Sequence, residues 1–268
     1  MPELPEVEVL RRKLERVIKD KVIQDVEIYD PAKLKGIKPE LLKGESIISV
    51  GRRGKHLYFD LSSGKKLVFH LRLRGKLVYG EDSDELAKPW IALKFRNGKS
   101  LFFGDPRRMA TLELVKDLNE IKTIAGMGPE PLDDSFTLDD FKRKVSNTSK
   151  KIKALLMDQS FVAGIGNVYA DEILYRAGIH PERSAKTLSA SEIDKLYFSI
   201  KDVLSEALEH NGVGEYTSLS VDDSEIGDYE KYLKVHGREG SPCPRCGTKI
   251  IKIKVGGRGT YLCPKCQL

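Results

Sequence analysis

The sequence predicts an α+β protein with an N-terminal β-sandwich domain that begins with a helix, a helical segment, and a C-terminal zinc-binding β-hairpin. Apolar residues alternate along most of residues 22–115, as they do in half-buried strands. They recur at helical spacing between residues 138 and 207. All four cysteines lie after residue 242, in two close pairs. At 268 residues, the chain is long enough for two domains and a small appendage.

The first domain is expected over residues 1–125. A helix is predicted over residues 5–18, where Val7, Leu10 and Leu14 fall on one side. Strands are then predicted at 22–28, 46–50, 56–61, 66–73, 91–95, 99–103 and 111–115. Glycine-containing turns such as Asn97-Gly98 separate them, so the domain is rich in antiparallel β-structure.

The helical segment is expected over residues 135–228, after a linker at 126–134 that is rich in Gly, Pro and Asp. Ser189 and Glu192 form a capping box for the longest predicted helix, which ends near Gly212. Shorter helices are predicted at 138–145, 152–157 and 168–177. Residues 211–228 show little periodicity and are interpreted as a long mobile loop, a kind of segment that is often functional.

The last segment, residues 229–268, is predicted to be a zinc finger. Cys243 and Cys246 form one C-x2-C pair, Cys263 and Cys266 form a second, and sixteen residues separate the pairs. Two residues between thiols let one turn direct both sulfurs at a single ion. One structural Zn²⁺ is therefore expected, held in a closed four-cysteine site that folds the hairpin and performs no chemistry.

Charge is distributed unevenly along the chain. From Tyr229 to the C-terminus there are nine Lys/Arg and two Glu, whereas the upstream part holds 37 basic and 38 acidic residues. Four thiolates and one Zn²⁺ would lower the net charge of the tail from +7 to about +5, which still leaves a basic patch. The alternative is a merely solvated cationic tail, but beside a metal-folded finger a polyanionic partner is favoured.

No apolar run approaches the roughly 18 residues needed to cross a membrane, and the N-terminus lacks the features of a secretory signal. Paired cysteines confined to one short segment favour reduced thiolates that bind metal over a disulfide framework. A cytoplasmic monomer with no membrane partner is expected.

Several motifs together resemble the formamidopyrimidine-DNA glycosylase and endonuclease VIII family. They are Pro2-Glu3-Leu4-Pro5-Glu6-Val7-Glu8, Gly51-Arg52-Arg53-Gly54-Lys55, His70-Leu71-Arg72, Asp105-Pro106-Arg107-Arg108, Gly164-Ile165-Gly166-Asn167-Val168-Tyr169-Ala170-Asp171-Glu172, Gly178-Ile179-His180-Pro181 and the finger. The first and fourth are more similar to the formamidopyrimidine branch. The resemblance covers essentially the whole chain. It implies that the helical segment is a helix-two-turn-helix domain and that the substrate is damaged double-stranded DNA.

The resemblance implies that Pro2 is the nucleophile. Once Met1 is removed, Pro2 would carry a free secondary amine, and α-amino groups, with pKa values of about 7.7 to 8.0, are partly unprotonated at neutral pH. In the family this amine attacks C1′, expels the base, forms a Schiff base and drives β,δ-elimination. Glu3 is the expected proton donor and acceptor, with Glu6 in support. The alternative for both carboxylates is a favourable interaction with the helix dipole.

Four further residues match phosphate contacts of the family: Lys55 at the active site, and His70, Asn167 and Arg258 elsewhere. Each has an ordinary alternative. Lys55 would be a solvated surface lysine. His70 would be a strand histidine with satisfied hydrogen bonds, and Asn167 the N-cap of the helix at 168–177. Arg258 would be a cation in a hairpin turn.

Leu73, Arg107 and Met109 match the three side chains that fill the gap left by an extruded nucleotide, with Arg107 also a DNA contact. Leu73 stands where methionine is common, and Met109 where phenylalanine is usual. Aliphatic side chains can still insert between bases, so the wedge role is expected to persist. The alternative for Leu73 is core packing, because it would share a strand face with Phe69 and Leu71.

The loop that starts Gly212-Val213-Gly214-Glu215-Tyr216-Thr217 departs from the Gly-Gly-Thr/Ser-Thr start that is common in the branch that removes 8-oxoguanine. Removal of formamidopyrimidine or 8-oxoguanine is the leading expectation. A preference for oxidised pyrimidines or hydantoins stays open, as does a non-catalytic zinc protein that binds nucleic acid.

Overall fold

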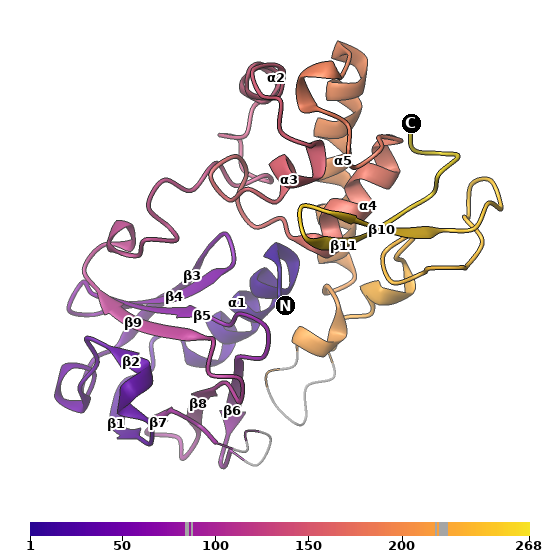
Figure 1. Cartoon of the computed structure of the whole chain (residues 1–268). Coiled ribbons are helices and arrows are strands. Elements are labelled where there is room, and N and C mark those ends of the chain that lie inside the picture. The colour runs from indigo at the N-terminus through magenta and orange to yellow at the C-terminus, as the bar shows by residue number, and fades with distance from the viewer. Residues whose placement is uncertain (84–85, 87, 218, 220–224) are drawn as a thin grey trace. The chain divides into compact units, whose positions relative to one another are not determined.

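The computed structural model describes residues 1–83, 86, 88–217, 219 and 225–268, and the chain divides into two compact units (Figure 1). The first unit is Met1–Gly126 together with Asn211–Gly227, and the second is Met127–His210 together with Asp228–Leu268. Residues 211–227, which continue the helical segment along the chain, thus group with the β-rich unit. Positions 218 and 220–224 of the predicted loop lie outside the described residues.

The first unit is a β-sandwich with a leading helix, as predicted. Helix α1 spans Leu4–Ile18. One sheet has the strand order β1-β7-β8-β6 and the other β2-β9-β5-β4-β3. The strands are β1 Ile23–Ile28, β2 Leu34–Lys35, β3 Ile47–Arg53, β4 His56–Leu61, β5 Lys66–His70, β6 Lys76–Gly80, β7 Ile91–Phe95, β8 Ser100–Gly104 and β9 Thr111–Val115. The ring centroids of Phe69 in one sheet and Phe103 in the other lie 5.2 Å apart, so the two inner faces share one core.

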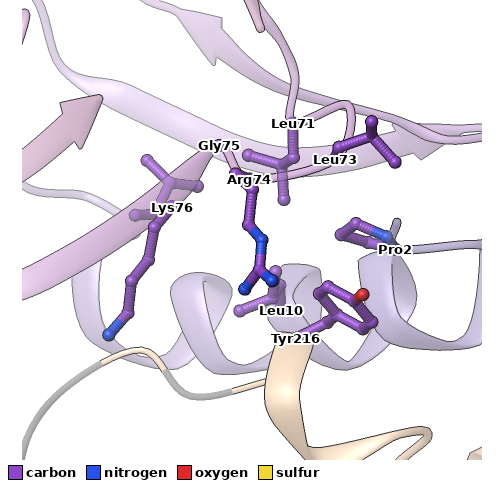
Figure 2. Close-up of a pocket in the computed structure, with 9 residues that line it drawn as sticks. Pro2, Leu10, Leu71, Leu73, Arg74, Gly75, Lys76 and Tyr216 are labelled. Atoms are coloured by element: carbon purple, nitrogen blue, oxygen red, sulfur yellow. The ribbon is translucent and has the colours of Figure 1, made fainter. Parts of the chain in front are cut away.

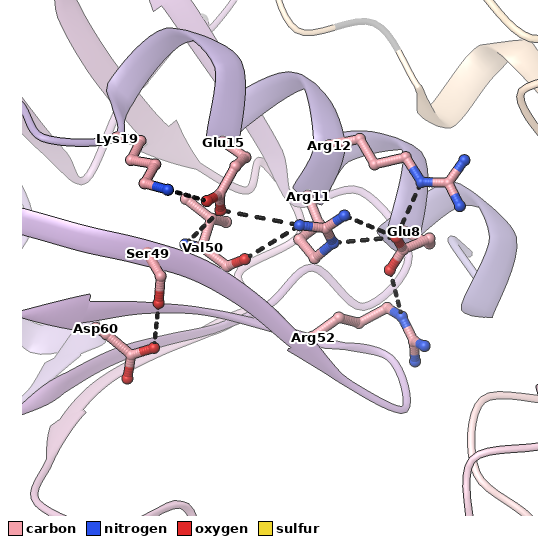
Figure 3. A network of polar contacts seen from close by, with 9 residues as sticks. All are labelled: Glu8, Arg11, Arg12, Glu15, Lys19, Ser49, Val50, Arg52 and Asp60. Carbon is pink, nitrogen blue, oxygen red and sulfur yellow. Dashed lines mark hydrogen bonds and ion pairs between the residues drawn. The ribbon is translucent and has the colours of Figure 1, made fainter. Parts of the chain in front are cut away.

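Helix α1 lies against this core and is also tied to β3 by charged side chains (Figure 3). Glu8 accepts hydrogen bonds from Arg11 on its own helix and from Arg52 on β3. Burial raises the pKa of Glu8, but Arg11 and Arg52 outweigh it and the net shift is downward. Glu15 accepts a 2.7 Å bond from the backbone N–H of Val50. Helix α1 is therefore tied to β3 both at its second turn, through Glu8, and near its end, through Glu15.

One predicted strand is too long, and two observed strands were not predicted. The strand predicted to run to Leu73 ends at His70, because Arg72 adopts a left-handed φ of 53° that no strand continues through. Strands β2 and β6 were not predicted. In β6, the consecutive residues Leu77, Val78 and Tyr79 are all buried, so the alternation that identifies a half-buried strand is absent.

The second unit is helical and carries a two-stranded hairpin. Its helices are α2 Leu138–Ser146, α3 Ile152–Leu156, α4 Asn167–Ala177 and α5 Ala190–Glu209, and its strands are β10 Ile251–Val255 and β11 Arg258–Leu262. The capping box is confirmed: Ser189 Oγ accepts from the Glu192 N–H, and the Glu192 carboxylate accepts from the Ser189 N–H. Gly178 ends α4 in the left-handed conformation, as its position predicts.

Single 3₁₀ turns complete both units: Pro31–Lys33, Pro39–Leu41, Leu118–Glu120, Ala185–Thr187, Gly214–Tyr216 and Tyr229–Lys231. Within the described ranges, none of the helices combines the length and apolar character needed to cross a membrane.

Candidate functional site

One end of the five-stranded sheet gathers most of the predicted site residues of the first unit. Strand register aligns Arg53 with His56, His56 with His70, and His70 with Thr111. Just beyond this row lie the turn with Lys55, the turn at 71–75 and the loop at 105–110. Residues that are up to 58 positions apart in the chain, from Arg53 to Thr111, therefore lie at one end of the sheet.

The proposed nucleophile and its acidic neighbours stand at the start of α1. Pro2, Glu3 and Glu6 are all buried. Glu6 Oε2 accepts a 2.8 Å hydrogen bond from the backbone N–H of Glu3, and Glu6 Oε1 accepts a 3.1 Å bond from the N–H of Val213. The Glu6 carboxylate thus fixes the backbone next to Pro2 and joins it to the segment 211–227, which suits a positioning role.

Pro2 borders a cavity of about 230 Å³ in the first unit (Figure 2). Its walls combine apolar, cationic and aromatic side chains: Pro2, Leu10, Leu71, Leu73, Arg74, Gly75, Lys76, Leu77 and Tyr216. Figure 2 shows the Arg74 side chain extending toward Leu10 and Tyr216. The leucines and Tyr216 offer apolar surface and the cations offer hydrogen-bond donors, a combination that suits a planar heterocyclic group.

Leu73 lies on the turn that follows β5 and is 37% exposed, whereas Phe69 and Leu71 are buried. Gly75 closes this turn by donating its N–H to the carbonyl of Leu71. A Cβ atom at Gly75 would lie 2.4 Å from that carbonyl oxygen and 3.0 Å from the Cβ of Ala110, so only glycine fits. The turn that carries Leu73 therefore packs directly against the loop that carries Arg107 and Met109.

Asp105 organises that second loop, a role that the sequence analysis missed. It is 1% exposed, and its carboxylate accepts hydrogen bonds from the backbone N–H groups of Arg107, Met109 and Ala110 at 2.8 to 2.9 Å. Arg107 is exposed, and Met109 is 51% exposed. The available signal was an aspartate followed directly by proline, which is typical of a turn in which the side chain caps the backbone.

Lys55 and His70 lie close enough for the lysine charge to act on the imidazole. Burial, followed by the nearby charges of His56, Arg72 and Lys55, lowers the pKa of His70 to about 2. Nδ1 of His70 accepts a 3.0 Å hydrogen bond from the Arg72 N–H. The neutral ring must then carry its proton on Nε2, which makes His70 a neutral hydrogen-bond donor of the kind that can bind a phosphate oxygen.

The two buried histidines should make the first unit sensitive to mild acid. Burial also lowers the pKa of His56 to about 4. Below pH 6.5 the unfolded chain binds protons that the folded chain refuses, so the free energy of unfolding falls as pH falls, by up to about 1.4 kcal/mol per pH unit for each histidine. From pH 7 to 5 we expect a loss of about 2 to 4 kcal/mol in total.

Urea unfolding followed by the fluorescence of Trp90, the single tryptophan and a buried core residue of this unit, measures the loss. His70→Asn should have a flatter pH profile than His180→Asn. Equal pH profiles for the two variants would contradict the lowered pKa of His70 as a cause of the acid sensitivity.

The four cysteines of the second unit form a site for one zinc ion. Their sulfurs lie within 4.8 Å of one another, with 3.9 Å between Cys243 and Cys266 and 3.5 Å between Cys246 and Cys263. Tetrahedral Zn²⁺ with Zn–S bonds of about 2.3 Å places sulfurs about 3.8 Å apart, so the geometry fits. Gly256 and Gly257, at φ of 54° and 78°, make the two-residue turn between β10 and β11.

Asn167 and Arg258 come together in the second unit. Asn167 Nδ2 donates a 3.0 Å hydrogen bond to the carbonyl of Gly259, next to Arg258 at the exposed end of the hairpin. Asn167 is the first residue of α4 and Gly166 is its N-cap, so the alternative that Asn167 caps the helix is wrong by one position. The Oδ1 atom of Asn167 is buried, and it accepts no hydrogen bond from any residue that the structure describes.

The hairpin is fixed to the helices by buried charges that the sequence analysis did not single out. Lys153 is 1% exposed, pairs with Asp171 at 2.7 Å and donates to Thr260 Oγ1 on β11. Glu172 accepts hydrogen bonds from the N–H groups of three consecutive residues, 234–236, at 2.8 to 3.0 Å. Two adjacent carboxylates on α4 thus hold both the hairpin and the segment that leads into it.

Three family profiles match the chain. "Formamidopyrimidine-DNA glycosylase N-terminal domain" matches residues 1–112, "Formamidopyrimidine-DNA glycosylase H2TH domain" matches residues 127–218, and "Zinc finger found in FPG and IleRS" matches residues 240–268. The chain is 43% identical to a formamidopyrimidine-DNA glycosylase of Pelotomaculum thermopropionicum, over all of this chain and 99% of that protein. It is 40% identical to one of Listeria innocua, over the full length of both.

Solved structures agree. The MutM (Fpg) protein of Thermus thermophilus is 38% identical with a TM-score of 0.89, over 99% of this chain and 98% of that chain. Lactococcus lactis Fpg in complex with DNA that contains Fapy-dG is 36% identical with a TM-score of 0.90, over 99% of both. The chain belongs to the formamidopyrimidine-DNA glycosylase family, whose members are DNA glycosylases and abasic-site lyases of base excision repair.

Proposed function

We propose that this chain excises formamidopyrimidine and 8-oxoguanine bases from duplex DNA and then cleaves the abasic strand, with Pro2 as nucleophile. The supporting observation is the cavity of about 230 Å³ that Pro2 borders together with Leu73 and Tyr216. Formamidopyrimidine as a substrate is supported by the relatives named formamidopyrimidine-DNA glycosylase. It is also supported by the structure of Lactococcus lactis Fpg in complex with DNA that contains Fapy-dG. The enzyme would act as a monomer on the DNA of the cytoplasm.

In the proposed reaction, the nitrogen of Pro2 forms a bond to C1′ and the base leaves with the electron pair of the glycosidic bond, which a proton then neutralises. Opening of the sugar ring gives a Schiff base between Pro2 and C1′. Loss of a C2′ proton expels the 3′ phosphate, and a second elimination expels the 5′ phosphate. Glu3, adjacent to the amine, is proposed to carry the protons, and Glu6 to hold the Glu3 backbone in place.

The remaining site residues are proposed to bind the DNA. Lys55 and His70 in the first unit, and Asn167 and Arg258 in the second, are proposed to contact phosphates. Leu73, Arg107 and Met109 are proposed to fill the gap left by the extruded nucleotide, which suits the exposure of these side chains at the end of one sheet. The zinc ion held by the four cysteines would keep the Arg258 hairpin folded.

Single-turnover excision from duplexes with one defined lesion tests the lesion class. Formamidopyrimidine and 8-oxoguanine should be released at least about tenfold faster than an oxidised pyrimidine or a hydantoin, a difference of about 1.4 kcal/mol in activation free energy. Undamaged duplex is the control. If an oxidised pyrimidine were released fastest, the proposed specificity would be wrong. If no lesion were released and borohydride trapped no adduct, the chain would be a non-catalytic binder.

A further inference from the structure

Lys13 is a buried charge that the proposed chemistry does not use. It lies in the middle of α1, is 5% exposed, and is surrounded by helix positions that pack on the core. Its Nζ donates a 2.9 Å hydrogen bond to the carbonyl of Thr217 and a 2.7 Å bond to the carbonyl of Glu225. Removing an ammonium group from water is unfavourable, so a buried lysine is tolerated here only when specific acceptors receive its hydrogen bonds.

The two carbonyls belong to residues on either side of 218–224. Thr217 is fully buried, and its Oγ1 accepts a 3.1 Å hydrogen bond from the Gly227 N–H, which links two described parts of segment 211–227. Leu219 is buried in the core of the first unit, and its carbonyl accepts from the Tyr79 N–H at 2.9 Å. These four described residues, Thr217, Leu219, Glu225 and Gly227, are called the stem, and they are built into the first unit.

Helix α1 connects this stem to the reaction centre. Pro2 precedes the first turn of α1, and Lys13 lies about 16 Å farther along at 1.5 Å per residue. Tyr216, which borders the same cavity as Pro2, directly precedes Thr217. One helix thus sets the position of the nucleophile at its start and, through Lys13, the position of Tyr216 in the same cavity.

We propose that Lys13 is a positioning residue for base recognition: it holds the stem so that Tyr216 faces the extruded base while Pro2 attacks. This inference rests on the proposed function. It predicts an asymmetry between the two activities, because an abasic site has no base to be held. Loss of Lys13 should slow excision of a damaged base and leave cleavage of a preformed abasic site nearly intact.

Lys13→Met tests this, since methionine keeps the length and removes the donors. Single-turnover excision of an 8-oxoguanine or formamidopyrimidine base should fall by about 10- to 100-fold, the range for losing charge-assisted hydrogen bonds. Cleavage of a preformed abasic duplex should change by less than about threefold. Lys13→Arg, which can still donate, should recover part of the excision rate.

Arg16→Gln is the matched control. Arg16 is one turn along the same helix and pairs with Glu225 at 2.6 Å, but both side chains are more than half exposed. Such pairs contribute little, so both rates should stay within about twofold. If Lys13→Met does not fold, Thr217→Val weakens the stem from the other side, by removing the acceptor of the Gly227 N–H, and should give the same asymmetry.

An equal fall of both rates, or no fall in excision, in a folded variant would overturn the role of Lys13 while leaving the proposed function standing. A wild-type chain that neither excises nor cleaves would overturn the proposed function and this inference together.

Discussion

A chain with one alanine inserted between Met1 and Pro2 should lose covalent trapping by borohydride and lose strand cleavage. The insertion converts the Pro2 nitrogen into an amide, whose lone pair is delocalised and cannot attack C1′. The new terminal amine would stand one residue away, outside the cavity that Pro2 borders. We expect both activities to fall at least about 10³-fold, which corresponds to about 4 kcal/mol of activation free energy.

Pro2→Gly is the control for this experiment, because it keeps a free α-amine at the same position once Met1 has been removed. Intact mass establishes which terminus each preparation carries. DNA affinity should change by less than about threefold in both variants, since no phosphate-contacting cation is altered. A covalent adduct that forms as fast in the insertion variant as in wild type would exclude Pro2 as the nucleophile.

Features that depend on neighbouring residues were predictable from the sequence. The Ser189–Glu192 box, Gly178 at the end of α4, the alternation in β4 and β9, and the two C-x2-C pairs each carry their own local signal. The hairpin followed from local signals as well, because residues 249–255 alternate between lysine and apolar side chains over most of their length and a glycine-rich turn follows at 256–259. Motifs in the N-terminal segment then suggested the catalytic residues, whereas without the motifs an interaction of Glu3 with the helix dipole was as good an interpretation as proton transfer.

Features that depend on contacts between distant segments were not predictable. From the sequence, Lys13 would be interpreted as a surface lysine. In the structure, the carbonyls of Thr217 and Glu225, more than 200 residues away in the chain, accept its hydrogen bonds. The grouping of 211–227 with the first unit has no sequence signal either, since it arises from these same long-range hydrogen bonds.

Loss of zinc should unfold the C-terminal hairpin. The apolar cluster around the metal site is small: Tyr175, Val235, Cys243, Ile250 and Cys263 are its buried members. Most of β10 is exposed, so packing alone cannot hold the hairpin. Zinc binding contributes about 10 to 16 kcal/mol in zinc-finger peptides, far more than such a cluster. Lys153 and Asp171 are buried, and they pair with each other while Lys153 also binds the hairpin. Unfolding of the hairpin would therefore leave this buried ion pair without one of its partners.

Cys263→Ser tests this dependence, with Lys265→Gln as the control because Lys265 lies inside the same C-x2-C pair and is exposed. Wild type and the control should bind one zinc per chain, and the Cys263 variant much less. DNA affinity should fall by about 10- to 100-fold in the Cys263 variant, as expected when Arg258 and its basic neighbours lose their fixed positions. The Trp90 unfolding transition should stay in place, because that residue lies in the other unit. A Cys263 variant that keeps full DNA affinity without bound zinc would show that the metal does not fold the hairpin.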